Sequence, residues 1–379
     1  MLQGYRILQI AAAAACTYLI LTFLSFESRA TEWRQNISHL SHSGVSDRDL
    51  AHIQNETLGF EHIYAIGMKE RPDKRDFLDV AASVTGFKVD WLEGVRPDEL
   101  KQKAMPNGLT LSDTKPAIVA CWRAHMNALV KIIENSYSSA LIFEDDADWD
   151  VNIKSQLHEF ARGLHSLQGN EKVSQEHPYG TDWDVLWIGG CGSEPNKNET
   201  QFYAIPNDPT LPSHQYRRWD LGGTPDSWKE QFPEDSTRFA FRAEAACCLF
   251  GYAVSNRGAR KILAALSIDH LEQPVDNAMS GLCGGNSGRR QIDCFATFPQ
   301  LIGTYRKAGP ASSDSEIENY SENQYHEEVS NYVMYSTRRN IHRLVAGEET
   351  VYAQWDDVPW AEGQINPKEL IYPHGVLVN

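Results

Sequence analysis

Between residues 62 and 190 the sequence alternates short apolar segments with longer amphipathic ones, and this alternation constrains the fold more than any other feature. The apolar segments have the length and the aromatic and β-branched content of buried strands. In the longer amphipathic segment, apolar side chains recur at helical spacing from Ile118 to Ile132. The strands are predicted at residues 62–68, 88–95, 139–143 and 183–190, and the helices at 73–86 and 114–135. This order predicts an α/β fold, a mixed sheet flanked by helices.

The second half of the chain is less regular. Residues 191–238 lose the periodicity and accumulate Pro, Asn, Asp, Ser and Trp over a length that is too great for an ordinary connection. This composition predicts an insertion that shapes a binding surface. We expect one main domain over residues 59–320 and a C-terminal helical extension over residues 321–379.

The N-terminus predicts the compartment. Residues 7–26 carry no charge, and about 20 apolar residues are enough for a helix to cross a bilayer. A signal peptide has a shorter apolar core, so we predict an uncleaved signal anchor within residues 1–26 and a single-pass type II topology with a lumenal body. The small side chains of Ser28 and Ala30 would permit cleavage after Ala30, which would make the protein secreted. The polar, aperiodic residues 27–58 predict a stem.

Two further features favour the secretory lumen. Four N-x-[ST] sequons are present, at Asn36, Asn55, Asn198 and Asn319. Of seven cysteines, all but Cys16 lie beyond the apolar N-terminal segment and are available for disulfides in an oxidising lumen. The adjacent Cys247 and Cys248 lie in an apolar run, which we interpret as buried packing.

The net charge of −16 disfavours general binding to nucleic acid or to an anionic membrane surface, because both need a basic footprint. It leaves room for a small basic pocket. Lys69, Arg71, Lys74 and Arg75 cluster just after the first predicted strand, where a turn opens a helix and suits recognition of phosphate or uracil. An exposed basic face is an equal alternative for each residue, and Arg71 and Arg75 are our first candidates.

An acidic cluster ends the central predicted strand. The segment ALIFEDDADWD (140–150) places five carboxylates within seven residues, from Glu144 to Asp150. Convergent carboxylates are unfavourable unless a positive charge compensates them, and Mn²⁺ or Mg²⁺ is the natural partner of such oxygen ligands. A solvated acidic turn is the simpler alternative. A structural calcium loop is disfavoured because its central Gly is absent.

Several segments resemble the glycosyltransferases of family 25, which include lipooligosaccharide and collagen galactosyltransferases. The acidic strand end is preceded by ACWRAHMNAL, where the family has Ser-His-x-x-Ala before Glu-Asp-Asp. Further similar segments follow in the family's order: EHIYAIGMKERPDKR (61–75), WDVLWIGG (183–190), GYAVSNRGARKIL (251–263), QPVDNAM (273–279) and SDSE (313–316). The chain departs from the family at Ala124, where the family has Ser, and at Val119, around which the family's Gly has no counterpart.

The resemblance implies a GT-A-like (Rossmann-like) fold, a UDP-sugar donor carrying galactose or glucose, a divalent cation (Mn²⁺ or Mg²⁺) and inversion at the anomeric carbon. A cation bridging both phosphates would neutralise the charge that develops on departing UDP. Asp146 and Asp148, read as Asp-x-Asp, are the expected metal and ribose contacts. In the alternative assignment, which includes Asp145, the Glu-Asp-Asp run at residues 144–146 supplies the ligands.

Two further residues are candidates for catalysis. His125 is a motif residue of the resemblance and is expected either to brace the acidic loop, to act directly, or to be a satisfied core histidine. Asp276 matches the family's Pro-Val-Asp and is our candidate for the base that deprotonates the acceptor hydroxyl. Capping of a helix N-terminus is the alternative role for Asp276.

The sequence as a whole predicts a metal-dependent inverting glycosyltransferase of the Golgi or endoplasmic reticulum membrane. It would move a hexose from a UDP-sugar to a hydroxyl of a glycan or glycoprotein acceptor. Two alternatives stay open. A metal-dependent phosphoesterase could use the same acids, although no second motif spaced for a two-metal site is present. A non-catalytic lumenal sugar- or metal-binding protein is the other, because of Ala124.

Overall fold

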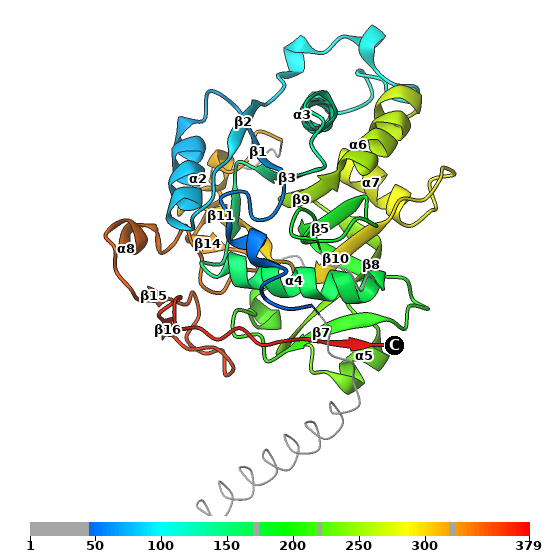
Figure 1. Cartoon of the computed structure of the whole chain (residues 1–379). Coiled ribbons are helices and arrows are strands. Elements are labelled where there is room, and N and C mark those ends of the chain that lie inside the picture. Colours follow the sequence, from blue (N-terminus) through cyan, green and yellow to red (C-terminus); the bar gives the residue numbers. More distant parts are fainter. Residues whose placement is uncertain (1–44, 170–173, 218–221, 318–322) are drawn as a thin grey trace, which may run out of the picture. The chain divides into compact units, whose positions relative to one another are not determined.

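The computed structural model describes residues 45–379 except 170–173, 218–221 and 318–322 (Figure 1). The predicted membrane anchor at residues 7–26 and the first part of the predicted stem lie outside these ranges. Over the ranges that are described, no helix is both long and apolar enough to cross a bilayer.

A mixed β-sheet forms the centre of the molecule. Nine of its thirteen strands lie in one path, in the order β17-β7-β8-β10-β5-β9-β3-β1-β2 (Figure 1). Strand β1 pairs in parallel with β2 and β3, whereas β9 lies antiparallel between β3 and β5. The strands are β1 (His62–Gly67), β2 (Asp90–Glu93), β3 (Ser139–Glu144), β5 (Val185–Gly189), β7 (Phe202–Pro206), β8 (Thr237–Cys247), β9 (Gly251–Ser255), β10 (Cys294–Phe298) and β17 (Val376–Val378). The predicted mixed α/β sheet flanked by helices is confirmed.

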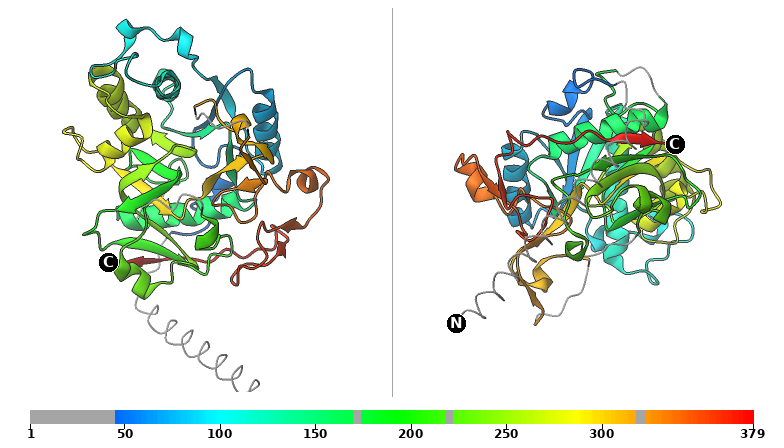
Figure 2. Two further views of the ribbon diagram at one scale, coloured as in Figure 1. Left: turned by 180° about the vertical axis from the view of Figure 1, so that it is seen from behind. Right: turned by 90° about the horizontal axis from the view of Figure 1, so that it is seen from below.

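The helices follow local sequence signals. Pro116 opens α3, and the helix buries its apolar side, including Trp122 and Leu129. The hydroxyl of Ser255 accepts a hydrogen bond from the amide of Gly258 at 3.0 Å and so caps α6, which lies beside α3 in Figures 1 and 2. The main helices are α2 (Pro72–Val84), α3 (Pro116–Glu134), α4 (Ile153–Gln168), α6 (Asn256–Leu263) and α7 (Val275–Cys283).

The predicted insertion at 191–238 contributes to the sheet as well as to the surface. It contains β6 (Gly192–Pro195), β7 and α5 (Asp226–Gln231), and β7 pairs with β8 in the main sheet. The short strands are separated by irregular segments, so no long periodic pattern announces them in the sequence.

Both ends of the described chain differ from their predicted form. Residues 45–58, assigned to the stem, include the 3₁₀-helix η1 (Ala51–Gln54) and bury Leu50, Ile53 and Leu58 in the main core. The predicted helical extension contains the short helix α8 (Ile341–Val345) and the strands β14 (Val329–Ser330), β15 (Val351–Tyr352), β16 (Gln364–Ile365) and β17. Strand β17 pairs with β7, so the C-terminus completes an edge of the sheet. The apolar residues in both of these regions are unevenly spaced, so the sequence shows no helical or strand periodicity there.

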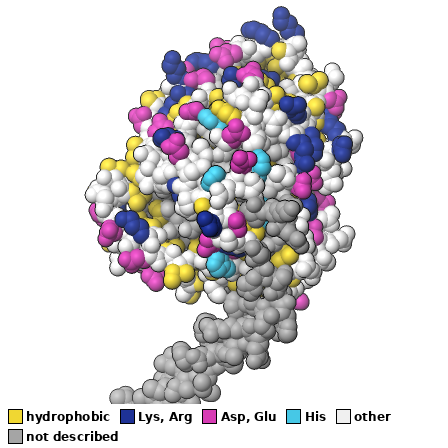
Figure 3. Space-filling model, viewed as in Figure 1, with side chains coloured by type: hydrophobic (Ala, Val, Ile, Leu, Met, Phe, Trp, Pro, Cys, Tyr) yellow, Lys and Arg dark blue, Asp and Glu magenta, His cyan; other side chains and the backbone are white. Residues whose placement is uncertain are grey.

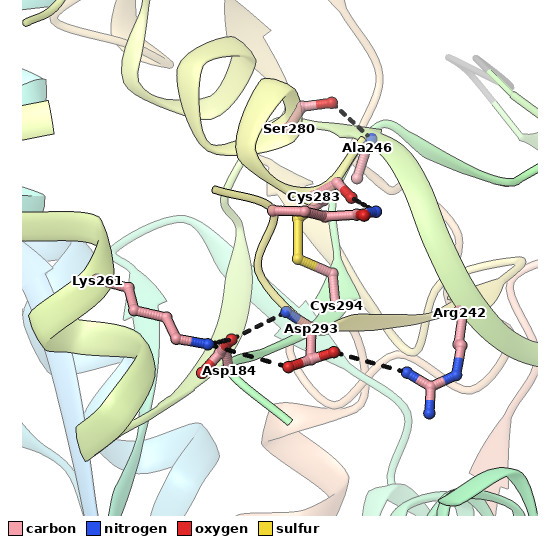
Figure 4. The surroundings of a disulfide bond; sticks show 9 residues. Asp184, Arg242, Ala246, Lys261, Ser280, Cys283, Asp293 and Cys294 are labelled. Atoms are coloured by element: carbon pink, nitrogen blue, oxygen red, sulfur yellow. Dashed lines mark hydrogen bonds and ion pairs between the residues drawn. A yellow bond between two sulfur atoms is a disulfide. The ribbon is translucent and has the colours of Figure 1, made fainter. Parts of the chain in front are cut away.

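Two disulfides join different segments of the described chain. Cys191 pairs with Cys248, which corrects the interpretation of Cys248 as simple packing. Cys283 of α7 pairs with Cys294 of β10, beside an ion pair between Lys261 and Asp184 (Figure 4). On the face shown in Figure 3, acidic and basic side chains are interspersed.

Candidate active site

The acidic cluster lies at the carboxyl end of β3, beside the carboxyl end of β1. The strand ends at Glu144, and a turn at residues 145–146 leads into β4 (Ala147–Trp149). Because the turn interrupts the strand's alternation, Glu144, Asp145 and Asp146 all line one cavity of about 790 Å³ that is partly open to solvent. The remaining wall comes from the end of β1, Lys74 of α2, the segment after β2, the first half of α3 and residues 314–317.

A second cavity, of about 1340 Å³, adjoins the first. It shares Cys121, Glu144 and Asp146 with the first cavity and is also lined by Asp276 and by the Cys191–Cys248 disulfide. The acidic cluster therefore lies where the two cavities meet. Ligands on its two sides would approach the same carboxylates.

Basic side chains partly compensate the cluster. The ammonium group of Lys74 lies 2.8 Å from Asp145, and the guanidinium of Arg306 pairs with Asp146. Burial raises the pKa of Asp145 to about 6, against the opposing effect of Lys74. Burial also favours the neutral form of Asp146, but Arg306 and Lys74 outweigh it and hold the pKa of that carboxyl below its usual range. Among the described residues, Oδ1 of Asp146 is buried without a hydrogen-bond partner.

Asp148 faces the other way. It lies on β4 opposite Gly303 of β11 (Ile302–Arg306), is fully buried, and lines neither cavity. Its carboxylate accepts hydrogen bonds from the backbone amides of Trp149 and Arg338 and from two hydroxyls, those of Ser330 and Ser336. The geometry therefore does not favour Asp146 and Asp148 as a pair of metal ligands. It favours the alternative assignment, in which Glu-Asp-Asp supplies the ligands.

Asp150 continues this buried network. One carboxylate oxygen accepts from the backbone and side-chain nitrogens of Asn152, each at 2.9 Å, and the other accepts from the Tyr335 amide at 2.9 Å. Burial raises the pKa of Asp150 to about 7. Asp148 and Asp150 together fasten the C-terminal segment to the sheet.

Arg71 and Arg75 line neither cavity. Arg71 pairs with Asp73 and with Glu316, while Arg75 pairs with Glu93 and lies over the ring of Trp91 at 4.8 Å. Lys74, between them in sequence, is the member of the predicted basic cluster that enters the first cavity.

His125 lies on α3 behind Glu144 and is almost fully buried. Its Nε2 atom is 3.2 Å from a carboxylate oxygen of Glu144, and its Nδ1 atom is 2.9 Å from the hydroxyl of Tyr252. This arrangement supports the bracing role, because the imidazole links the acidic strand end to β9.

Asp276 is the second residue of α7, and the residue that precedes the helix is Pro274. Its carboxylate accepts a hydrogen bond from the Cys248 amide at 3.0 Å and faces the second cavity. The predicted N-cap role therefore does not apply. The contact instead ties α7 to the disulfide.

Several cavity residues were not selected from the sequence. Arg306 ends β11, and Asp314 and Glu316 belong to the SDSE segment. The imidazole of His326 lies 2.8 Å from Asp314, and Arg71 holds Glu316, so this segment is fixed over the acidic cluster. The resemblance of the SDSE segment pointed to Asp314 and Glu316, whereas nothing in the sequence distinguishes Arg306 at the end of an ordinary strand.

Sequence comparison finds similarity to known proteins over part of the chain. No family model matches the chain. The chain is 21% identical to procollagen galactosyltransferase 1 of Danio rerio over an alignment of 272 residues that covers 66% of this chain and 37% of that protein. It is 24% identical to procollagen galactosyltransferase 2 of Homo sapiens, and equally to that of Mus musculus, over 178 residues, or 44% of this chain and 26% of each relative. The similarity thus covers well under half of each relative's length.

Proposed function

We propose that the chain is a glycosyltransferase that moves a hexose, most simply galactose, from a UDP-sugar to a hydroxyl of a glycoprotein or glycan. One observation carries the proposal: the acids from Glu144 to Asp146 lie where two adjoining cavities meet. Transfer between two bound molecules needs such an arrangement, with a donor on one side and an acceptor on the other. The similarity to procollagen galactosyltransferases supports the same class of reaction.

The first cavity suits the donor. Lys74 is mostly buried there and supplies a positive charge within reach of a diphosphate. The wall contributed by α3 is formed by small residues, among them Ala117, Ala120 and Ala124, which leave space for a flat ring. Asp145 now pairs with Lys74, and a phosphate group would compete for that cation.

The acidic wall fits a hard divalent cation, Mn²⁺ or Mg²⁺. Three carboxylates line the same cavity there, and Oδ1 of Asp146 is buried without a hydrogen-bond partner among the described residues. Glu144, Asp145 and Asp146 would hold the ion, in place of the predicted pair with Asp148. When bound, the ion would neutralise charge on the departing diphosphate.

The second cavity suits the acceptor. Asp276 faces it and is held by the Cys248 amide, so its carboxylate has a fixed orientation. We assign it the removal of the proton from the acceptor hydroxyl, as inverting transfer requires a base on that side. The Cys191–Cys248 disulfide fixes the backbone that holds this base.

The secretory lumen is the proposed compartment, in the Golgi or the endoplasmic reticulum. Two disulfides are stable in an oxidising lumen. The sequon residues Asn55 and Asn198 are both exposed, as glycosylation requires. The membrane anchor predicted at residues 7–26 remains part of the proposal.

The test is a donor screen with the full-length protein. We expect release of UDP from UDP-galactose or UDP-glucose, dependent on added Mn²⁺ and lost in Asp146→Asn. Asp226→Asn is the matched control, since Asp226 is an exposed acid on α5. Hydrolysis of phosphate esters without turnover of any UDP-sugar would instead establish a phosphoesterase. Metal binding without turnover of either substrate would establish a binding protein.

A further inference from the structure

A second set of potential metal ligands lies beside the acidic wall. Cys121 and His125 are four residues apart on α3 and so project from one side of the helix. Glu144 reaches the same point from the end of β3. The thiol sulfur, an imidazole nitrogen and a carboxylate oxygen of these three residues all lie within 4.8 Å of one another.

The donor set differs from that of the acidic wall. Thiolate and imidazole are the ligands that zinc prefers, whereas Mn²⁺ and Mg²⁺ prefer oxygen. In a tetrahedral zinc site with nitrogen and oxygen ligands, neighbouring donor atoms are about 3.3 Å apart. Nε2 of His125 and the nearest oxygen of Glu144 are 3.2 Å apart. We infer that Cys121, His125 and Glu144 form a zinc-binding site with one coordination position open to the cleft.

Tyr252 supports this site from behind. Its hydroxyl lies 2.9 Å from Nδ1 of His125 and is fully buried. A hydroxyl can accept as well as donate, so it can accept a hydrogen bond from Nδ1–H, and the unprotonated Nε2 then directs its lone pair at Glu144 and Cys121. A hydrogen bond to the second nitrogen is the usual support of a metal-bound histidine.

The thiol of Cys121 is available for such a role. Four cysteines of the described chain are paired in disulfides, and Cys121 and Cys247 are the two that are not. Cys121 lines both cavities, so an ion can reach it from the cleft. Cys247 lies near the Cys191–Cys248 disulfide, whose two sulfurs are already bonded to each other. Cys247 therefore provides a matched control for a free thiol outside the site.

Zinc at this position has a consequence for the proposed transfer. Glu144 belongs both to this site and to the acidic wall, and it lines both cavities. Zinc bound there would withdraw Glu144 from the Mn²⁺ ligands and occupy the space common to donor and acceptor. We therefore expect Zn²⁺ to inhibit transfer. This consequence rests on the proposed function, whereas the binding of zinc does not.

The experiment titrates Zn²⁺ into the full-length, EDTA-treated protein against a chromophoric chelator and repeats the titration with Co²⁺. We expect one ion per chain and a thiolate-to-cobalt charge-transfer band. Cys121→Ser should abolish the band and weaken Zn²⁺ binding by more than about 100-fold, beyond the range for loss of an outer contact. Tyr252→Phe should weaken it by about 10-fold. Cys247→Ser should bind as the unaltered protein does.

Two results would overturn the inference: Co²⁺ binding without the thiolate band, or unchanged Zn²⁺ affinity in Cys121→Ser. If thermal unfolding shows that Cys121→Ser is misfolded, Glu144→Gln replaces it, because the amide keeps the shape of the side chain and an acceptor for His125. Unchanged affinity in Glu144→Gln would overturn the inference equally. Absence of UDP-sugar turnover together with intact zinc binding would count against the proposed function alone.

Discussion

The acidic run contains two regions that share a composition and differ in environment. Glu144, Asp145 and Asp146 line the cleft, whereas Asp148 and Asp150 are buried beneath it. The turn at residues 145–146 separates the two sets. Residue type alone therefore does not assign a function to these carboxylates, because the path of the backbone decides which of them a ligand can reach.

The partners of the two sets differ as well. The cleft acids pair with long cationic side chains, Lys74 with Asp145 and Arg306 with Asp146. The buried acids accept hydrogen bonds from backbone amides and short hydroxyls that cannot move away. A bound metal or phosphate can replace the first kind of partner, but replacing the second would require local unfolding.

The largest expected effect tests the buried set. Asp148→Ala removes the acceptor of two hydroxyls and two amides and leaves these donors unsatisfied in the core. We expect the free energy of unfolding to fall by about 3–5 kcal/mol, measured by chemical denaturation. Asp226→Ala, which alters an exposed acid, should leave it nearly unchanged. Equal stability of the two variants would show that the Asp148 network does not support the fold.

The next effect tests the cleft set. Asp146→Asn keeps an acceptor for Arg306 but removes the negative charge, so kcat/KM for the UDP-sugar should fall by at least about 100-fold. The free energy of unfolding should fall by less than in Asp148→Ala, since the amide oxygen keeps one hydrogen bond from Arg306. Steady-state kinetics and denaturation on the same preparation check both expectations. If Asp146→Asn is strongly destabilised but fully active, Asp146 supports the fold and not the reaction, which would contradict the assignment of the two acids.

A smaller effect concerns pH. Burial raises the pKa of Asp145 from 3.8 to about 6 in the folded protein. The folded state therefore keeps a proton that the unfolded chain releases, and the free energy of unfolding falls as pH rises from about 4 to about 6. In Asp145→Asn this contribution is absent, so its stability should decline less across the same window. Denaturation curves in EDTA at several pH values test this, and parallel declines for both proteins would contradict it.

The smallest effect extends the comparison to the basic cluster. Arg75→Ala removes an ion pair with Glu93, a hydrogen bond to the Gly67 carbonyl and a contact with Trp91, and it should cost about 1–2 kcal/mol. Transfer should stay close to that of the unaltered protein, because Arg75 lies outside both cavities. Lys74→Ala should clearly reduce the rate of transfer. If Arg75→Ala lowers kcat/KM more than Lys74→Ala does, Arg75 is a donor contact, as the sequence analysis predicts.

Much of the fold could be predicted because the sequence signals that specify its elements are local. The apolar run of β3, the proline that opens α3 and the helical spacing after it all act within a few residues. The predicted boundaries of these elements agree with the structure within about two residues. The segments around Leu50 and β17 were missed because their few apolar residues are held by distant partners and carry no period.

The candidate site was predicted in part. Placement of acids at the carboxyl end of a central strand, with a basic cluster after the first strand, followed from the sequence. Of the predicted basic cluster, Lys74 lines the first cavity, whereas Arg71 pairs with Glu316 at its wall and Arg75 lies over Trp91. These partners lie on other elements, so local reasoning about the helix could not find them.

The sequence by itself determined the class of fold and the strand end at which the acids gather, because short-range periodicity and strand termination depend only on neighbouring residues. Only the tertiary structure decided which acids face the cleft. A single turn rotates the chain between Asp146 and Asp148, and segments more than 150 residues away supply Arg306 to one and Ser330 to the other. Which acids face the cleft depends on contacts between elements that are far apart in the sequence. Such contacts form only when the chain folds.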